Sequence, residues 1–144
     1  MQEQGVSGSP SRVKILKTFN VGDLVVVNLN PTVGDEKQKT RICLVIEAGG
    51  TPLELIIILP ITEYHEKRNK YFFVPIPNFK EVGLSKASAI DCYQIRTVSI
   101  SRLRKSVKNE TLVIGKLPKN ILDEVRKRLA LILDITEQHL DDSF

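Results

Sequence analysis

The sequence contains no tryptophan, and its 144 residues include only five phenylalanines and three tyrosines. A core built from this chain must rely on valine, isoleucine and leucine, and the β-branched ones suit the pleated surface of a sheet. The longest apolar run covers residues 55–61, far short of the roughly 20 residues of a membrane-spanning helix. The first residues also lack the cationic and apolar pattern of a secretion signal. These absences predict a cytoplasmic protein with no membrane partner.

Cysteine and histidine are equally scarce, with two of each. Cys43 and Cys92 lie inside apolar runs without CxxC spacing, so we expect two reduced, buried core residues. His65 and His139 are far apart and lack the ligand spacing of a zinc site. We therefore expect no metal and no cofactor.

Charges of both signs are present, with 21 Lys and Arg against 17 Asp and Glu, and the net charge is +4. A mildly basic chain favours polyanionic partners, because neutralising phosphates releases condensed counterions. Many proteins that bind no nucleic acid have a similar balance, so the charge is not decisive. The 42% hydrophobic and 26% charged residues are globular values that exclude wholesale disorder.

The length suits one domain with a short leader. Residues 1–11 are rich in Gly, Ser and Pro and predict a flexible leader. Residues 12–144 predict a single domain with no second hydrophobic core. Residues 13–19 fit either a short helix or an added edge strand.

Strand patterns follow one another through the middle of the chain. Apolar runs bounded by Gly, Asn and Pro predict strands at residues 24–29, 42–46, 53–61, 71–76, 87–93 and 94–98. A short helical turn is predicted at residues 101–103 and a hairpin at 105–115. Residues 32–40 and 64–70 predict exposed loops, of which the second carries Lys67, Arg68 and Lys70. This cationic loop is either simply solvated or attracts a polyanion.

The apolar period changes near the end of the chain. Apolar residues at three- and four-residue steps predict a helix with one buried face: Ile121, Leu122, Val125, Leu129, Ile132 and Leu133. Pro118 suits its first turn, and Arg126, Lys127 and Arg128 are predicted on its solvated side. The fold class is mainly β with α (α+β), a mostly antiparallel sheet or barrel closed by a C-terminal helix.

Six short motifs occur in order along this framework. They are Gly22-Asp23, Asn30-Pro31-Thr32, Gly34-Asp35-Glu36-Lys37-Gln38-Lys39-Thr40-Arg41, Pro60-Ile61-Thr62, Gly83-Leu84, and Gln94-Ile95-Arg96-Thr97 followed by Arg102-Leu103. Each motif alone is short enough to occur by chance in unrelated proteins. Together and in this order they resemble the MazF/PemK toxins of type II toxin–antitoxin modules, across roughly residues 20–135. The resemblance implies an SH3-like barrel of the MazF, Kid and CcdB plasmid-maintenance-toxin type, usually a homodimer.

The same resemblance implies a sequence-specific, metal-independent endoribonuclease that cleaves single-stranded RNA such as mRNA, inhibiting translation and growth. The ribose 2′-hydroxyl attacks the adjacent phosphate and leaves a 2′,3′-cyclic phosphate and a 5′-hydroxyl. The implied protein partner is a cognate antitoxin of the MazE/PemI type. Two alternatives share the fold: a non-catalytic toxin that inhibits DNA gyrase, and an RNA-binding module that has lost nuclease activity.

The resemblance assigns the two catalytic positions to Arg41 and Thr62. A guanidinium is a planar, permanently charged donor for phosphate oxygens that gain charge during the reaction, and the threonine hydroxyl is a second donor. A pKa above about 12 makes arginine a poor general base, so we expect Arg41 to stabilise charge. No histidine lies in a matched motif to abstract the proton. The alternatives are a surface ion pair for Arg41 and a turn cap for Thr62.

The predicted RNA-binding residues are Gly34, Glu36, Lys37, Gln38, Lys39 and Gln94. The loop that holds the first five is either a mobile lid over RNA or a plain connection between two strands. The Glu36 carboxylate is suited to accept a hydrogen bond from the amino group of a nucleobase. Arg96 lies within an apolar strand, so we expect a buried, paired structural residue rather than a catalytic one. Ile42 stands where the family usually has proline, and residues 106–114 are longer than the usual link.

Overall fold

The computed structural model describes residues 20–49, 54–66, 71–106 and 111–140. The predicted leader, the segment at residues 13–19 and the cationic residues Lys67, Arg68 and Lys70 lie outside these ranges, as does the tip of the predicted hairpin.

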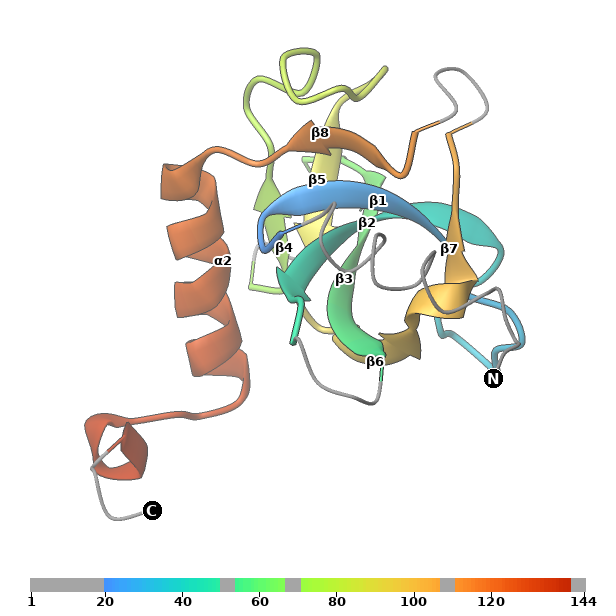
Figure 1. Cartoon of the computed structure of the whole chain (residues 1–144). Coiled ribbons are helices and arrows are strands. Elements are labelled where there is room, and N and C mark those ends of the chain that lie inside the picture. Colours follow the sequence, from blue (N-terminus) through green and yellow to red (C-terminus); the bar gives the residue numbers. More distant parts are fainter. Residues whose placement is uncertain (1–19, 50–53, 67–70, 107–110, 141–144) are drawn as a thin grey trace.

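A curved, eight-stranded antiparallel sheet makes up most of the described chain, with one α-helix beside it (Figure 1). The strands are β1 (Asp23–Asn28), β2 (Thr40–Glu47), β3 (Leu55–Glu63), β4 (Phe73–Pro75), β5 (Ser88–Asp91), β6 (Arg96–Ser99), β7 (Leu103–Arg104) and β8 (Val113–Lys116). Their order is β4-β5-β3-β2-β1-β7, with β6 also paired to β3 and β8 to β1. Together with the helix α2 (Lys119–Ile132), this confirms the mainly β fold with a C-terminal helix.

Alternation along the central strands divides the buried side chains between the two faces of the sheet. Leu24 and Leu44 belong to a cluster that includes Leu122 and Val125 of α2. Their neighbours, such as Cys43, belong to a second cluster enclosed by the curved sheet. The central strands are therefore buried on both faces.

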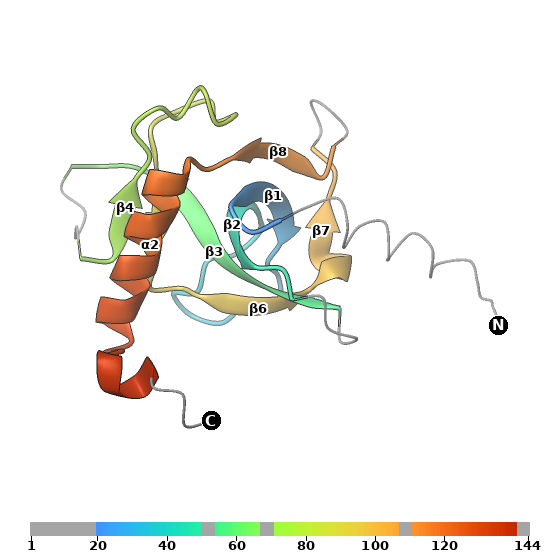
Figure 2. The same cartoon turned by 60° about the vertical axis from the view of Figure 1, so that its left-hand side comes forward.

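The second cluster is enclosed because the chain curls around it (Figure 2). The short 3-10 helix η1 (Ile100–Arg102) joins β6, which pairs with β3, directly to β7, which pairs with β1. This confirms the predicted helical turn, which begins one residue earlier than expected. The predicted hairpin is only partly right, since in the described ranges β7 and β8 both pair with β1, while Ser106 N–H donates to the Thr111 carbonyl at 2.7 Å.

The helix α2 follows the predicted period. Leu122, Val125 and Leu129 are buried against the first cluster, and Pro118 stands at the N-cap. Leu133 departs from the prediction: the helix ends at Ile132 and Leu133 is 52% exposed. No helix in the described ranges is long and apolar enough to cross a membrane.

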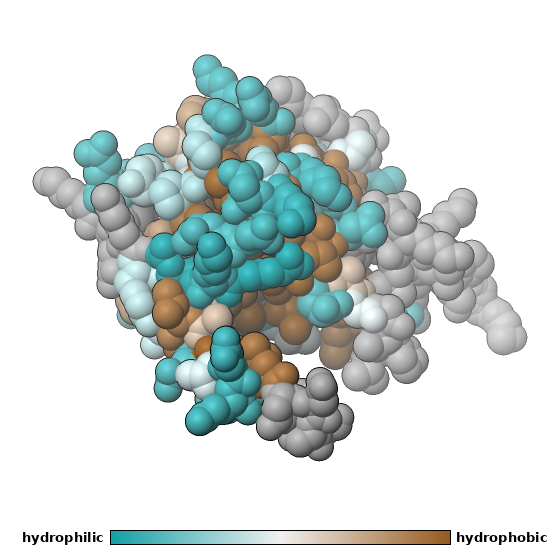
Figure 3. Space-filling model, turned by 90° about the vertical axis from the view of Figure 1, so that its left-hand side faces the viewer, coloured by the Kyte–Doolittle hydropathy of each residue, from teal (hydrophilic) through white to brown (hydrophobic). Residues whose placement is uncertain are grey.

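The outer face of α2 is largely hydrophilic (Figure 3), and Arg126 and Lys127 are exposed there as predicted. Arg128 was wrongly placed with them. It is half-buried and donates to the Tyr71 carbonyl at 3.2 Å and to Glu124 at 3.4 Å. Its long stem reaches the residues before β4, so it helps to attach the helix to the sheet. The element η2 (Glu137–Leu140) follows.

Two glycines allow the segment before β5 to contact β8. A Cβ on Gly83, whose φ is +93°, would lie 2.3 Å from the Ile114 carbonyl oxygen. A Cβ on Gly115 would lie 1.7 Å from the Val82 carbonyl oxygen. Only glycine fits such a backbone approach, which gives the motif Gly83-Leu84 a structural reason.

Candidate active site

The site begins where β2 and β3 separate. Their ladder ends at the pair Cys43–Pro60, yet β2 starts earlier, at Thr40, and β3 continues to Glu63. Residues 40–42 stay paired with β1, and residues 61–63 pair with β5. The two strand ends therefore diverge, and a cavity lies between them.

This cavity, here called the strand-end cavity, has a volume of about 510 Å³. All six residues of the diverging ends line it: Thr40, Arg41, Ile42, Ile61, Thr62 and Glu63. Five other residues complete the lining: His65, Leu84, Ser85, Lys86 and Ser88. Arg41 and Thr62, which are 21 positions apart in the sequence, thus face one space. Extending the Cys43–Pro60 register by two residues puts them opposite each other.

Arg41 is half-buried at the start of β2, and its Nε donates to the Gln38 carbonyl at 2.9 Å. This bond uses one edge of the guanidinium and leaves the terminal nitrogens for another acceptor. Among the described residues no carboxylate is paired with Arg41. Within the described residues Arg41 therefore forms no surface ion pair, which was the alternative to a catalytic role.

Thr62 is 7% exposed and lies opposite Ala89 of β5. Its hydroxyl has no hydrogen-bond partner among the described residues, although buried polar groups are usually paired. It caps no turn there, because β3 continues through Glu63. A buried, unpaired hydroxyl on a cavity wall is available to a ligand.

Three charged or titratable side chains of this cavity were not predicted as site residues: Glu63, His65 and Lys86. The Glu63 carboxylate lies 3.6 Å from Lys86 Nζ and 3.9 Å from His65 Nε2. The available sequence signal was the position of His65, three residues after Thr62. No sequence signal placed Lys86 there, because it comes from the segment before β5.

A second cavity, here called the loop cavity, has a volume of about 710 Å³. It is lined by Leu29, Pro31, Asp35, Glu36, Lys37, Pro60, Tyr93, Gln94, Ile95 and Arg96. Three of the six predicted RNA-binding residues line it, namely Glu36, Lys37 and Gln94. Pro60 lines this cavity and Ile61 lines the other, so consecutive residues of β3 connect the two.

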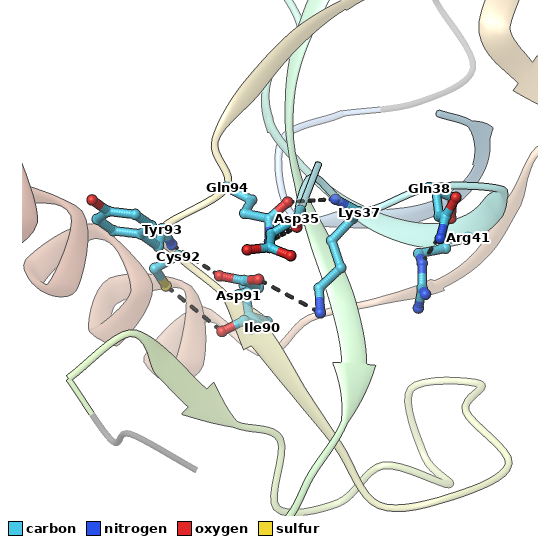
Figure 4. Close-up of polar contacts among 9 residues, drawn as sticks. All are labelled: Asp35, Lys37, Gln38, Arg41, Ile90, Asp91, Cys92, Tyr93 and Gln94. Atoms are coloured by element: carbon cyan, nitrogen blue, oxygen red, sulfur yellow. Dashed lines mark hydrogen bonds and ion pairs between the residues drawn. The ribbon is translucent and has the colours of Figure 1, made fainter. Parts of the chain in front are cut away.

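The loop between β1 and β2 is anchored by Gln94 (Figure 4). The Gln94 Oε1 atom accepts from Lys37 N–H at 2.6 Å, and its Nε2 donates to the Asp35 carbonyl at 3.4 Å. Both ends of this amide therefore bind loop backbone. Sequence reasoning assigned Gln94 to RNA, and the described structure adds a role in holding the loop.

Lys37 gives the loop a second anchor, since its Nζ lies 3.9 Å from Asp91 Oδ2 at the end of β5. Asp91 is only 2% exposed and also accepts from Tyr93 N–H at 3.1 Å. Figure 4 shows this pair apart from the Arg41 side chain. Lys37 thus combines a place on the loop-cavity wall with an ion pair to a buried carboxylate.

The remaining loop candidates lie around these anchors. Glu36 Oε1 accepts from Val33 N–H at 2.7 Å, so one of its oxygens closes a turn. Lys39 N–H donates to Asn30 Oδ1 at 3.0 Å, and its carbonyl accepts from Leu29 N–H at 2.9 Å. Gly34, Gln38 and Lys39 line neither cavity, and the Gln38 carbonyl instead orients Arg41.

Two arginines bind the backbone where β1 ends. Arg96 is half-buried and donates to the Leu29 carbonyl at 2.8 Å, as expected for a paired structural residue. Arg102 donates to the carbonyls of Asn28, at 3.1 Å, and Asn30. These bonds fix the start of the loop. Ile42, where the family usually has proline, is half-buried and packs against the first cluster.

Cys43 and Cys92 are free and buried, as predicted. Burial raises the pKa of the Cys43 thiol from 9.0 to about 12, against a smaller lowering effect of Arg41. Burial likewise raises the pKa of the Cys92 thiol from 9.0 to about 12. Both thiols are protonated at neutral pH, so neither acts as a nucleophile. No group of three or more His, Cys, Asp and Glu within the described ranges is arranged to hold a metal ion.

Comparisons with known proteins agree with this geometry. The family model of PemK-like, MazF-like toxins of type II toxin–antitoxin systems matches residues 20–133. Endoribonuclease PemK of Escherichia coli is 30% identical over 115 residues, which cover 78% of this chain and 80% of PemK.

Two solved structures share the fold. MazF of Deinococcus radiodurans has 23% identity and a TM-score of 0.63, over 81% of this chain and 97% of that one. A MazE–MazF structure from the same organism has 24% identity and a TM-score of 0.60, over 82% and 97% of the two chains. By the extent of the family match and the identity to PemK, this chain belongs to the PemK-like, MazF-like family of type II toxins.

Proposed function

We propose that this toxin is a sequence-specific, metal-independent endoribonuclease that cuts single-stranded RNA, including mRNA, and thereby stops translation and growth. The observation that carries the proposal is the strand-end cavity, which is lined by both Arg41 and Thr62. Each of them has hydrogen-bond donors to spare within the described chain. The name of the E. coli relative, an endoribonuclease, supports the same activity.

The chemistry follows from where charge grows. Attack of the ribose 2′-hydroxyl on the adjacent phosphorus adds charge to the non-bridging oxygens, so donors placed there lower the barrier. The terminal nitrogens of Arg41 match two such oxygens, and the Thr62 hydroxyl supplies a further bond from a buried position. The products are a 2′,3′-cyclic phosphate and a 5′-hydroxyl.

The loop cavity suits a nucleobase beside the scissile phosphate, because Pro60 and Ile61 connect it to the strand-end cavity. Tyr93 on its wall is 62% exposed and offers a ring for stacking. Glu36, Lys37 and Gln94 on the same wall are the proposed base and backbone contacts. Gly34, Gln38 and Lys39 would meet the RNA further along the loop.

We also propose a homodimer that is neutralised in the cytoplasm by a cognate antitoxin of the MazE/PemI type. The D. radiodurans MazF was solved together with MazE, and the matching family consists of toxins of type II toxin–antitoxin systems. The antitoxin assignment comes from these relatives and the homodimer from the family resemblance, rather than from a surface of this chain.

The proposal is tested by incubating the purified protein with a long single-stranded RNA in excess EDTA and mapping the ends of the products. We expect cuts at one short motif, with 2′,3′-cyclic phosphate and 5′-hydroxyl termini. An RNA with 2′-deoxyribose at the scissile nucleotide should bind and stay intact.

Three outcomes would contradict the proposal. Intact RNA together with inhibited DNA gyrase would favour the non-catalytic toxin of the same fold. Intact RNA that is nevertheless bound tightly would favour an RNA-binding module without nuclease activity. Cutting that stops in EDTA would contradict the metal-independent mechanism.

A further inference from the structure

The proposed reaction needs a group that accepts the proton of the 2′-hydroxyl, and Arg41 is unsuited to this step because guanidinium stays protonated. On the basis of the proposed function, we propose that His65 is the general base of this toxin. Sequence reasoning passed over His65, because it lies in no matched motif.

His65 is in the right place for this role. It lines the strand-end cavity together with Arg41 and Thr62, the residues that would bind the phosphate. It follows the end of β3 by two residues, so it lies near the strand that carries Thr62. Its side chain is 55% exposed, which leaves it accessible to an RNA that enters the cavity from solvent.

The position of Glu63 favours one ring nitrogen of His65 as the base. Its carboxylate oxygen lies 3.9 Å from His65 Nε2 and can only accept a hydrogen bond. A hydrogen on Nε2 directed at this carboxylate would leave the lone pair of the neutral ring on Nδ1. This separation is longer than a hydrogen bond, and catalytic hydrogen bonds often shorten when substrate binds. In the proposed mechanism Glu63 is therefore a positioning residue, and Nδ1 is the basic atom.

The surrounding charges are compatible with this arrangement. Besides Glu63 on β3, the charged groups on the cavity wall are Arg41 from β2 and Lys86 from the segment before β5. Lys86 Nζ lies 3.6 Å from the other Glu63 oxygen, so the carboxylate is held between lysine and histidine. Of the hydroxyls in the cavity, Ser88 donates to the Lys86 carbonyl at 2.7 Å and is no base at neutral pH.

The step balances without any co-reactant. His65 Nδ1 takes the proton of the 2′-hydroxyl while the 2′-oxygen forms a bond to phosphorus. The bond from phosphorus to the 5′-oxygen breaks, and the leaving oxygen takes a proton from water. The imidazolium then returns its proton to solvent.

The test compares single-turnover cleavage by wild type and His65→Gln across pH, in EDTA. Loss of a general base lowers rates by about 10²–10⁴-fold, so we expect a fall in that range for His65→Gln. The wild-type rate should rise with pH through a one-proton inflection that the variant lacks. Imidazole added to the buffer should partly restore the variant, and binding of an RNA with a 2′-deoxyribose at the scissile position should be unchanged.

The matched control is His139→Gln, which changes the other histidine of the chain. His139 lies in η2, where its Nδ1 accepts from Thr136 N–H at 3.0 Å, and it does not line the strand-end cavity. We expect wild-type cleavage and an unchanged pH profile.

Two results would overturn the inference, and they differ in what else they remove. If wild type cuts to cyclic phosphate ends and His65→Gln cuts within about threefold of it with the same inflection, His65 is not the base while the proposed function stands. If wild type does not cut RNA at all, the proposed function fails and the role of His65 fails with it.

Discussion

At the scale of single residues, the site is defined by donors that the protein itself leaves unpaired. The Thr62 hydroxyl is buried without a partner in the described chain, and the Arg41 guanidinium uses only its Nε edge within the protein. An unpaired buried hydroxyl costs stability. Its presence on a cavity wall beside an arginine fits a site prepared for phosphate oxygens.

Thr62→Val therefore removes a donor to the substrate without removing a bond inside the protein. We expect single-turnover cleavage to fall by about 10²–10³-fold, as for the loss of one donor to a developing oxyanion. The melting temperature should be unchanged or higher, because valine has the same shape and no unpaired polar group. Thr62→Ser keeps the hydroxyl and should keep most of the rate. A fully active Thr62→Val would rule out this role.

Substitutions of Gly34 and Gly83 distinguish the backbone strain of a side chain at positive φ from a steric clash of its Cβ. Both have positive φ, at +93° and +59°, but a Cβ on Gly34 meets nothing within 4 Å. Gly34→Ala should cost only the conformational strain, about 1 kcal/mol. Gly83→Ala adds a clash with the backbone before β8, and we expect a loss of about 2–4 kcal/mol. Denaturant unfolding measures both losses, and equal values would contradict the close contact.

At the scale of elements, most strands were predictable from the sequence and the partners of some were not. The apolar runs at residues 24–29 and 42–46 predicted β1 and β2 well. The prediction for β3 stopped at Ile61 because Thr62 and Glu63 are polar. Pairing with β5 extends the strand and buries Thr62, and no local pattern encodes that. The hairpin prediction used local sequence alone, whereas β7 and β8 pair with the distant β1.

The candidate site shows the same limit. The motifs with Arg41 and Thr62 were visible because family resemblance attaches roles to short strings. His65 was visible as a residue of a polar loop, but its neighbour Lys86 is brought to Glu63 only by the fold. Arg128 was misplaced for a related reason, since helical spacing says nothing about how far a long side chain reaches back toward the sheet.

Anchoring of the loop between β1 and β2 can be measured through Gln94→Leu. This change removes the acceptor of Lys37 N–H, which is 2.6 Å away. One such bond contributes about 1 kcal/mol, so the Lys37 amide should exchange about fivefold faster with solvent. Gln38→Leu is the control, because only the backbone carbonyl of Gln38 takes part in a hydrogen bond in the described chain. Equal exchange in Gln94→Leu and wild type would show that Gln94 does not hold the loop.

At the scale of the whole molecule, the buried thiols link stability to pH. The folded protein keeps both thiol protons up to a pKa of about 12, whereas an unfolded thiol loses its proton near 9.0. The folded state thus binds more protons above pH 9, and the free energy of unfolding must fall as pH rises toward 12. The slope is at most about 1.4 kcal/mol per pH unit for each thiol.

Cys43→Ala should therefore lose stability less steeply than wild type between pH 9 and pH 11, whatever its stability at pH 7. Chemical unfolding at a series of pH values measures the two slopes. Parallel slopes for wild type and Cys43→Ala would contradict the burial of a protonated thiol in the second cluster.

The strand-end cavity is itself a property of the whole fold, since it combines the start of β2, the end of β3 and the segment before β5. In this cavity Arg41 is proposed to stabilise the charge that develops on the scissile phosphate. The most direct measurement is the single-turnover cleavage rate of Arg41→Ala, with Arg126→Ala on the outer face of α2 as the charge-matched control. We predict a rate at least about 10²-fold below wild type, with an unchanged melting temperature and a fully active control. An Arg41→Ala variant that cuts RNA at a rate near wild type would contradict that claim.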